Sequence, residues 1–345
     1  MPERDPQQQS ARTISAWLTV EKLKTVNWLT VISALVAVAV VIPTVLSLMA
    51  RWFWPLDLLT HFRIQIAAIQ LAVAAILLLI GRFKIAIIPV VALIWNVTWF
   101  GEYLIPHRQV DETSVQVDES DLTSNKLRVM SVNVFTRNRN HDRLIEVIRK
   151  HQPDIVLILE VNDRWSRALQ QLNADYPHSL HSPREDNFGM AVFSRIPFIE
   201  SGFQQIGRAS LPMFRGQVQL DSERIEILGF HVLPPTRTEG AMSRNEDLVA
   251  IAQIAEESPH PMIVLGDMNC TPWSPYFRDV CRTGKLRDSR IGFEISGTWP
   301  AGNPFVRLPI DHILVSPEFS VTSFSNCNNI SSDHLPVLAT LRLAK

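Results

Sequence analysis

The sequence of 345 residues contains little cysteine, few charged residues and no excess of basic charge. Three cysteines exclude a disulfide-stapled scaffold, and the lack of a C-x-x-C pair gives no sign of a zinc site. The 33 lysines and arginines are balanced by 34 aspartates and glutamates, so the net charge does not indicate a nucleic-acid binder. Charged residues make up 19% and hydrophobic residues 46%, which excludes a chain that is disordered throughout.

The hydrophobic residues are concentrated in three runs that contain no charged residue, at positions 25–50, 64–80 and 85–101. A membrane-spanning helix needs roughly 20 apolar residues, so the first run is long enough and the other two, of about 17 residues each, are near the lower limit. Trp52, Phe53 and Trp54 lie between the first two runs and suit the headgroup region of a bilayer. We therefore expect residues 25–104 to form a transmembrane anchor of three helices.

Two alternatives compete with this anchor. A cleavable signal peptide fits the first run poorly, because its lead-in is long, its apolar stretch exceeds the usual length and no clear A-x-A site follows. Burial of the helices in a soluble core is the second alternative, and nothing in the sequence favours it over the anchor.

The basic residues predict the orientation of the anchor. One side of the membrane would carry six of them, namely Arg4, Arg12, Lys22, Lys24, Arg82 and Lys84, and the opposite loop only two, Arg51 and Arg63. By the positive-inside rule, residues 1–24 are cytoplasmic. Everything after about Tyr103 would then lie in the periplasm or outside the cell, and the chain would be a multi-pass protein of the cell (inner) membrane.

Residues 105–126 are acidic and polar without a helical or strand period, which is typical of a linker. From residue 127 to 345, short apolar strands alternate with helices. We expect strands at 127–134, 155–159, 190–193, 217–220, 225–232, 262–265, 310–315 and 337–343. Many strands and few helices predict an α+β fold, a four-layered α/β sandwich of two packed mixed sheets flanked by helices, preceded by the three transmembrane helices.

Polar residues stand where these apolar strands begin or end, and a rigid sheet can direct such side chains into one cleft. They are Asn133, Glu160, His231, Asp267, Asn269, Asp311, Asp333 and His334. Taken singly, each has an ordinary structural explanation, such as a turn formed by Asp-x-Asn or a buried amide that satisfies the backbone. Taken together, they form an oxygen-rich set, which favours Mg²⁺, Mn²⁺ or Ca²⁺ over softer metals.

The order of the surrounding motifs is more specific than any one residue. The blocks are MSVNV at 130–134, PDIVLILE at 153–160, GMAVFSR at 189–195, GFH at 229–231, GDMN at 266–269, IDHIL at 310–314 and SDHLP at 332–336. This ordered set resembles the endonuclease/exonuclease/phosphatase superfamily over about residues 125–345. The three-span N-terminus looks like that of membrane-tethered bacterial members. No acidic residue follows Asn133 closely, unlike in the apurinic-type nucleases, which weakens a DNA-repair interpretation.

The resemblance implies hydrolysis of a phosphoester by a metal-activated water. It implies that Glu160 holds Mg²⁺ or Mn²⁺, with Ca²⁺ less expected, and that Asn133 and Asp333 assist as ligands or supporting groups. Asp267 would orient or deprotonate the water, and Asn269 would donate hydrogen bonds to the phosphorus centre.

The histidines have implied roles of their own. His334 would contact the scissile phosphate while Asp311 fixes its ring, and His231 would act as general acid or phosphate ligand; which histidine does which task stays open. Arg244 and Asn245, at the start of an expected helix, could bind substrate phosphate, although a solvated helix start is the plainer interpretation.

The sequence thus predicts a membrane-anchored, divalent-metal-dependent phosphoesterase. Its partners would be the lipid bilayer and a phosphoester, whether a lipid headgroup, a small phosphoester or nucleic acid, with no stable nucleic-acid partner. A periplasmic or extracellular nuclease is the first alternative, and a non-catalytic membrane protein that keeps the fold as a binding module is the second. Cys270 and Cys281 are close enough in sequence for a disulfide, but buried free thiols are the default expectation.

Overall fold

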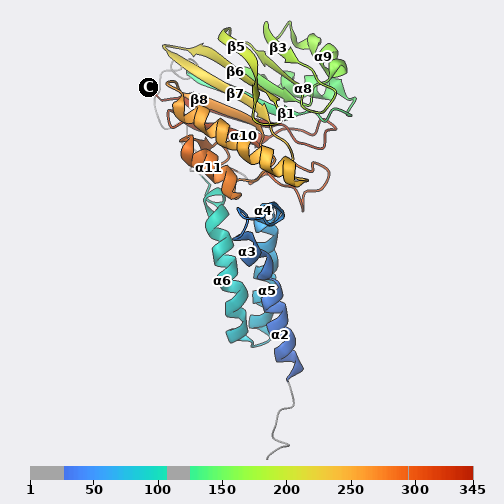
Figure 1. The fold of residues 1–345 in the computed structure, drawn as a ribbon, viewed down its shortest axis with the longest axis vertical. Coiled ribbons are helices and arrows are strands. Elements are labelled where there is room, and N and C mark those ends of the chain that lie inside the picture. Colours follow the sequence, from blue (N-terminus) through green and yellow to red (C-terminus); the bar gives the residue numbers. More distant parts are fainter. Residues whose placement is uncertain (1–26, 107–124, 294, 345) are drawn as a thin grey trace, which may run out of the picture. The chain divides into compact units, whose positions relative to one another are not determined.

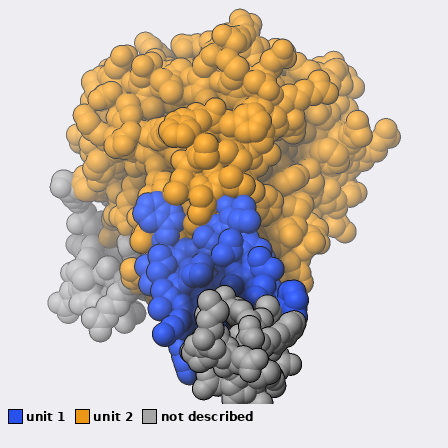
Figure 2. Space-filling view, turned by 60° about the horizontal axis from the view of Figure 1, so that its bottom comes forward, with its two compact units in different colours: residues 1–43, 66–95 blue, residues 44–65, 96–345 orange. Residues whose placement is uncertain are grey.

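A computed structural model describes residues 27–106, 125–293 and 295–344 of the chain. Its residues divide into two compact units, 1–43 with 66–95 and 44–65 with 96–345, which Figure 2 colours blue and orange. The expected cytoplasmic segment 1–24 lies outside the described residues, as does most of the expected linker 105–126.

The helices of the N-terminal third are apolar. They are α2 (Trp28–Ala39), α3 (Ile42–Ser47), α5 (Arg63–Leu79) and α6 (Phe83–Phe100). Among the described residues, two helical stretches are long and apolar enough to cross a membrane, Trp28–Ser47 and Phe83–Leu104. A third span exists only if α5 is counted together with α4 (Trp54–His61), from which it is bent by 65°. The structure therefore supports two spans and leaves the expected third as a prediction.

Small residues allow the helices of the first unit to approach closely. Ala37 of α2, Leu77 of α5 and Ala86 of α6 are buried against one another. Gly81 makes the tight turn between α5 and α6 with a φ of +75°, a backbone conformation that glycine adopts without strain. The outward faces of these helices carry exposed leucine, isoleucine and valine, which suits contact with lipid.

The second unit contains two six-stranded mixed sheets. The first has the order β11-β12-β1-β2-β4-β3, in which only β1 and β2 run parallel. Its strands are β1 (Lys126–Asn133), β2 (Ile155–Leu159), β3 (His178–Ser182), β4 (Met190–Ser194), β11 (Phe319–Asn326) and β12 (Val337–Leu343). The run at 155–159 is buried at every residue, as expected of a central strand.

The second sheet has the order β5-β6-β7-β8-β10-β9, with β7 and β8 as its parallel pair. Its strands are β5 (Phe198–Ile206), β6 (Leu211–Leu220), β7 (Glu223–His231), β8 (Met262–Asp267), β9 (Arg287–Asp288) and β10 (Asp311–Val315). All eight expected strands are therefore present, with shifted ends in several cases.

Three apolar layers hold the sandwich together. Leu157, Ile227 and Ile263 belong to the layer between the two sheets. Helices α8 (His141–His151) and α9 (Asp163–Leu169) cover the first sheet. Helices α10 (Thr238–Glu257) and α11 (Pro275–Thr283) cover the second, and Figure 1 shows α10 lying across it. The expected sandwich of two mixed sheets flanked by helices is confirmed.

Residues 44–65, which contain α4, belong to the same compact unit as the two sheets. Helix α4 begins with Pro55 in its first turn, where proline loses no intrahelical hydrogen bond. Cys270, Cys281 and Cys327 are free thiols. The disulfide between Cys270 and Cys281, which the sequence left open, is therefore absent.

Candidate active site

Strand register brings the predicted polar residues into line. His231 at the end of β7 is paired with Asp267 at the end of β8, and Asp267 is in turn paired with Asp311 at the start of β10. Residues paired across neighbouring strands share a face of the sheet, so these three side chains form one row. Asn133, at the end of β1 in the first sheet, contacts Asp267 of this row, so both sheets contribute side chains to the site.

Asn133 connects the carboxylates of the two sheets. Its Nδ2 donates to Glu160 Oε1 at 3.1 Å and to Asp267 Oδ2 at 3.4 Å, while its Oδ1 accepts from the backbone of Phe135 at 3.0 Å. Asn133 thus turns its amide NH2, not its carbonyl oxygen, toward the carboxylates. In this conformation it orients Glu160 and Asp267 and does not itself offer an oxygen ligand.

Glu160 follows β2 directly, at a left-handed backbone turn with a φ of +63°. This conformation is uncommon for a residue with a side chain. Thr136 fixes it in two ways: its backbone N donates to Glu160 Oε2 at 3.0 Å, and its hydroxyl donates to the Glu160 carbonyl at 2.9 Å. The Glu160 carboxylate is therefore directed at the site by the loop after β1.

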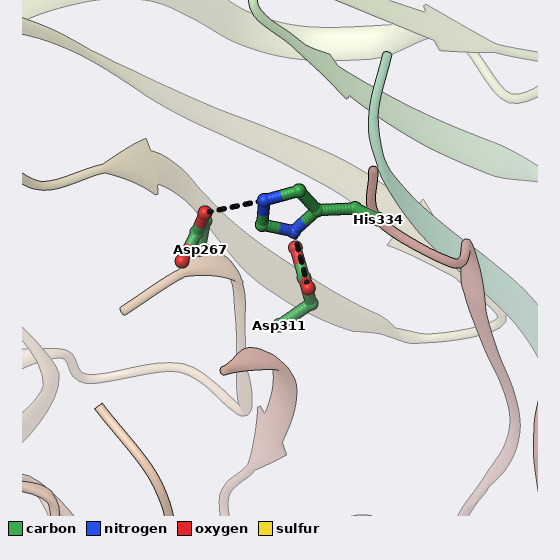
Figure 3. Close-up of side chains that lie close together, drawn as sticks. All are labelled: Asp267, Asp311 and His334. Atoms are coloured by element: carbon green, nitrogen blue, oxygen red, sulfur yellow. Dashed lines mark hydrogen bonds and ion pairs between the residues drawn. The ribbon is translucent and has the colours of Figure 1, made fainter. Parts of the chain in front are cut away.

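His334 lies between two aspartates, as Figure 3 shows. Its Nδ1 is 2.8 Å from Asp311 Oδ2, and its Nε2 is 3.8 Å from Asp267 Oδ2. The loop that carries His334 is tied to the first sheet because Ser332 Oγ donates to the Asn133 carbonyl at 2.8 Å. All three side chains are buried, and their ligand atoms lie within 4.8 Å of one another.

His231 approaches the same carboxylate from the other side, with its Nε2 3.6 Å from Asp267 Oδ2. Burial and the positive charge of His334 lower the pKa of His231 to about 4, so this ring is neutral near pH 7. For His334, burial alone would lower the pKa, but Asp311 and Asp267 outweigh it and raise the pKa to about 10. The two histidines therefore differ in charge, one neutral and one cationic.

The carboxylates of the site also differ from one another. Burial raises the pKa of Asp267, and the charge of Asp311 raises it further. Burial likewise raises the pKa of Glu160, against the hydrogen bonds from Thr136 and Asn133. For Asp311, burial is outweighed by His334, and the net effect is a lowered pKa. Asp311 is thus the carboxylate that stays ionised and holds the His334 ring.

This donor set fits a divalent cation. The charges that act most strongly on Glu160 and Asp267 come from histidine and from other carboxylates, with no lysine or arginine among them. Oδ1 of Asp311 and Oδ1 of Asp333 are buried without a hydrogen-bond partner among the described residues. A hard divalent ion would satisfy such oxygens and would offset the excess of negative charge. The ligand atoms of Asp267, Asp311 and His334 are spaced for a metal ion, which His334 could bind only as the neutral imidazole.

Asn269 and Asp333 lie at the edge of the cluster. Asn269 donates from its backbone N to Asp267 Oδ1 at 2.9 Å, while its side-chain Nδ2 donates to the Val232 carbonyl at 2.9 Å. Asp333 accepts from Trp299 Nε1 at 3.3 Å, and its charge acts on Glu160. Asn269 is therefore fixed to Asp267 by a hydrogen bond, and Asp333 lies close enough to Glu160 for its charge to act on that carboxylate.

Arg244 and Asn245 are placed differently from the expectation. Arg244 is fully buried and pairs with Asp57 of α4 at 2.7 Å, and its other guanidinium N–H groups donate to Asn245 Oδ1 and to the Asn269 carbonyl. The predicted substrate contact needs correction, because the guanidinium of Arg244 has protein partners and no exposed surface. Asn245 Oδ1 accepts hydrogen bonds from Arg244, and the contact of Asn245 with substrate stays a prediction.

Several residues of the site have no clear signal in the sequence. Thr136 and Ser332 hold Glu160 and the His334 loop through hydroxyl hydrogen bonds. The Phe188 ring lies 4.9 Å from His231, and the Trp299 ring lies 6.5 Å from His334. Only their positions next to predicted motifs distinguish these residues from others of their type. Phe188 precedes Gly189, and Thr136 follows the motif at 130–134 by two residues.

The fold and the site together define a two-sheet α/β sandwich with a buried centre of acidic and histidine side chains. The model of the Endonuclease/Exonuclease/phosphatase family matches residues 130–334, and the chain belongs to this family. It is accordingly a hydrolase that acts on phosphoester bonds. No curated protein matches the chain.

Solved structures show the same fold at low sequence identity. An endonuclease/exonuclease/phosphatase from Beutenbergia cavernae is similar with 21% identity and a TM-score of 0.54, covering 64% of this chain and 72% of its own. A D. rerio TDP2 complexed with single-strand DNA product has 18% identity and a TM-score of 0.53, covering 63% of this chain and 99% of its own. A family member from Bacteroides vulgatus has 17% identity and a TM-score of 0.53, with coverages of 63% and 99%.

Proposed function

We propose that this chain is a membrane-anchored, divalent-metal-dependent phosphoesterase whose catalytic unit lies outside the cytoplasm. The observation that carries the proposal is the convergence of Asn133, Glu160, Asp267, Asp311 and His334 in one buried cluster that draws on both sheets. The first and last of these residues, Asn133 and His334, are 201 positions apart in the sequence, and packing alone does not require the five to meet.

Glu160 is the residue that would hold the divalent ion, with Asn133 orienting its carboxylate and Asp333 adding negative charge nearby. When bound, a divalent ion supplies Lewis-acid polarisation of a phosphoryl oxygen and promotes ionisation of water. Mg²⁺ or Mn²⁺ suits the hard oxygen set better than Ca²⁺, because three or four closely spaced groups form a compact site.

The chain's own residues supply the proton transfer and the orientation. Asp267, held by the Asn269 backbone, would orient or deprotonate the attacking water. His334, cationic and fixed by Asp311, would stabilise negative charge on the phosphoryl group and donate a proton to the leaving oxygen. His231, which is neutral, would accept a hydrogen bond or a proton at the same centre. Asn269 would donate to the phosphoryl group if its amide leaves the Val232 carbonyl.

The lipid bilayer is the proposed partner of the N-terminal helices. Two apolar stretches are long enough to cross it, and the bent pair α4 and α5 would provide the third crossing. The balance of six basic residues against two supports a cytoplasmic N-terminus. An odd number of crossings then carries the catalytic unit to the periplasm or the outside.

The full chain, purified in detergent, tests the proposed reaction on a panel of phosphoesters. The panel contains bis-p-nitrophenyl phosphate, p-nitrophenyl phosphate, phospholipids, nucleotides and plasmid DNA. We expect hydrolysis of at least one phosphoester with Mg²⁺ or Mn²⁺, its loss with EDTA and its return when the metal is restored. Hydrolysis that is indifferent to EDTA would contradict the metal-dependent mechanism, and inactivity on the whole panel with each metal would favour a non-catalytic binding module.

The same panel separates the proposed enzyme from the alternative of a dedicated nuclease. Nuclease activity would degrade plasmid DNA and would weaken steeply with added salt, because binding to the phosphate backbone releases counterions. Turnover limited to phospholipids or small phosphoesters would exclude that alternative.

A further inference from the structure

Helix α4 contacts the loop that carries the catalytic residues of β8, residues 267–274, which we name the catalytic loop. The Thr271 backbone N donates to His61 Nδ1 at 3.3 Å, and Trp273 Nε1 donates to the His61 carbonyl at 2.9 Å. Trp273 and Thr271 are buried, so these hydrogen bonds are sheltered from water. A segment more than two hundred residues earlier in the chain therefore packs directly behind the catalytic loop.

Asp57 of α4 is the centre of a second set of contacts with the same loop. Its Oδ1 accepts from Ser274 Oγ at 3.1 Å, and its Oδ2 accepts from Arg244 Nη2 at 2.7 Å. Asp57 is 1% exposed and Arg244 is fully buried. A buried ion pair adds little net stability compared with well-packed apolar residues, so stability alone does not account for it.

Arg244 connects Asp57 to Asn269. Its Nη1 donates to the Asn269 carbonyl at 3.3 Å, while Asn245 accepts from its Nε and Nη2. Asn269 has a left-handed φ of +47°, and its backbone N holds Asp267. A residue in that sparsely populated conformation keeps it only when its surroundings fix it. Arg244 is one of the groups that do so, through its hydrogen bond to the Asn269 backbone carbonyl.

We propose that Asp57 and Arg244 are positioning residues for the catalytic loop, which makes helix α4 part of the active site and not merely part of the anchor. Asp57 orients Arg244, and Arg244 holds the Asn269 backbone, whose N–H in turn keeps the Asp267 carboxylate in its orientation. The inference rests on the proposed phosphoesterase function. It implies that residues 125–345 alone lack a component of the working site.

Three variants of the full chain in detergent test this inference. Asp57→Asn keeps the size of the side chain and removes the partner of the Arg244 charge. Asp57→Asn combined with Arg244→Met removes both charges, which should restore much of the thermal stability that the single variant loses. Asp279→Asn is the matched control. Asp279 pairs with Arg51 at 2.6 Å, so this substitution also removes an ion pair between residues 44–65 and the rest of their unit, but one that involves no residue of the catalytic loop.

The readouts are the Tm, the kcat and KM for bis-p-nitrophenyl phosphate with Mg²⁺, and hydrogen exchange of the 268–274 amides. For Asp57→Asn we expect kcat to fall about 10-fold or more with KM nearly unchanged. In the double variant the Tm should recover while kcat stays low, and the loop amides should exchange faster than in the wild type in both cases. Asp279→Asn should retain kcat within about twofold.

A merely structural role would give a different pattern. If kcat returned with the Tm in the double variant, or if loop exchange were unchanged in Asp57→Asn, the inference would be overturned. A second cycle adds Asp267→Asn: if Asp57 acts by holding Asp267 through the Asn269 backbone, the combination should lose no more kcat than Asp267→Asn alone, whereas multiplied losses oppose the inference. A wild-type chain that hydrolyses none of the probes would refute the proposed function, and loop exchange would still decide whether α4 holds the loop.

Discussion

His334 Nδ1 lies 2.8 Å from Asp311 Oδ2, and this contact sets the charge of the histidine that faces Asp267. Burial by itself would make a neutral imidazole the favoured form. The ionised Asp311 reverses that preference and raises the pKa of His334 to about 10. One carboxylate therefore fixes both the orientation of the ring and the proton that it carries.

Asp311→Asn should lower kcat by about 10²- to 10⁴-fold, because the ring loses its orientation and its favoured charge. The pKa of His334 should fall, so the alkaline limb of the pH profile of kcat/KM should move to lower pH. The profile is measured on the full chain with bis-p-nitrophenyl phosphate and Mg²⁺. Asp175→Asn is the control, since Asp175 is an ion-paired aspartate that contacts Arg149 on the surface. An alkaline limb that does not move would contradict the assigned pairing.

Glu160→Gln should separate metal binding from folding. Burial disfavours the charged form of Glu160, which a neutral amide of the same shape relieves, but the amide NH2 must then face a donor, either the Thr136 backbone N or Asn133 Nδ2. The Tm in EDTA should therefore change little. In the wild type, Mg²⁺ at about 100-fold above its Kd should raise the Tm by about 5 to 10 °C. Glu160→Gln should lose this increase together with activity, whereas exposed Glu146→Gln should keep both. An undiminished Mg²⁺ effect in Glu160→Gln would place the metal elsewhere.

The central strands were predictable because burial leaves a direct mark on their composition. Ile155–Leu159 and Met262–Asp267 are buried at every position, and both were expected from unbroken apolar runs. The strands Phe198–Ile206 and Phe319–Asn326 lie at sheet edges with several exposed polar residues, so their sequences resemble loops. Edge strands take their identity from the neighbour with which they pair, which a local pattern does not reveal.

The cluster of candidate catalytic residues was predictable for a related reason. Asn133, Glu160 and Asp267 interrupt apolar strands at their ends, where a polar residue has no part in the core. The role of Arg244 was not predictable, since its partner Asp57 is 187 positions away in a segment whose composition indicates a membrane anchor. Contacts of that kind depend on tertiary packing alone, and no spacing rule connects the two residues.

Asp247 should make stability depend on pH, outside the catalytic cluster. Both of its carboxylate oxygens are buried without a hydrogen-bond partner among the described residues. Burial, with a smaller effect of Glu246, raises its pKa to about 7. The folded chain therefore favours the protonated acid, and this stabilising contribution is present at low pH and is lost as the pH rises from about 4 to 7.

Asp247→Asn mimics the protonated acid at every pH and should remove that loss. The Tm of the variant should exceed that of the wild type at pH 8, and the difference should shrink as the pH falls toward 5. Thermal unfolding of both chains across this range checks the prediction. Parallel curves, with a constant difference in Tm, would show that Asp247 does not titrate in the folded chain.

The predicted orientation of the chain rests on an asymmetry in basic residues, and a pair of reporter fusions can test it. Arg82 in the turn between α5 and α6, and Lys84 in the first turn of α6, should lie in the cytoplasm, and the C-terminus should lie outside. Alkaline phosphatase, which becomes active only where disulfides form, should be active when fused after Lys345 and inactive when inserted at the turn. A fluorescent protein that matures only in the cytoplasm should give the opposite result at both positions.

Replacing Arg82 and Lys84 with glutamine should weaken this preference for a cytoplasmic turn, because the count of basic residues on the cytoplasmic side, against two on the other side, falls from six to four. A phosphatase signal at the turn of the unmodified chain would place the catalytic unit in the cytoplasm, where nucleic acids and cytoplasmic phosphoesters become its accessible substrates.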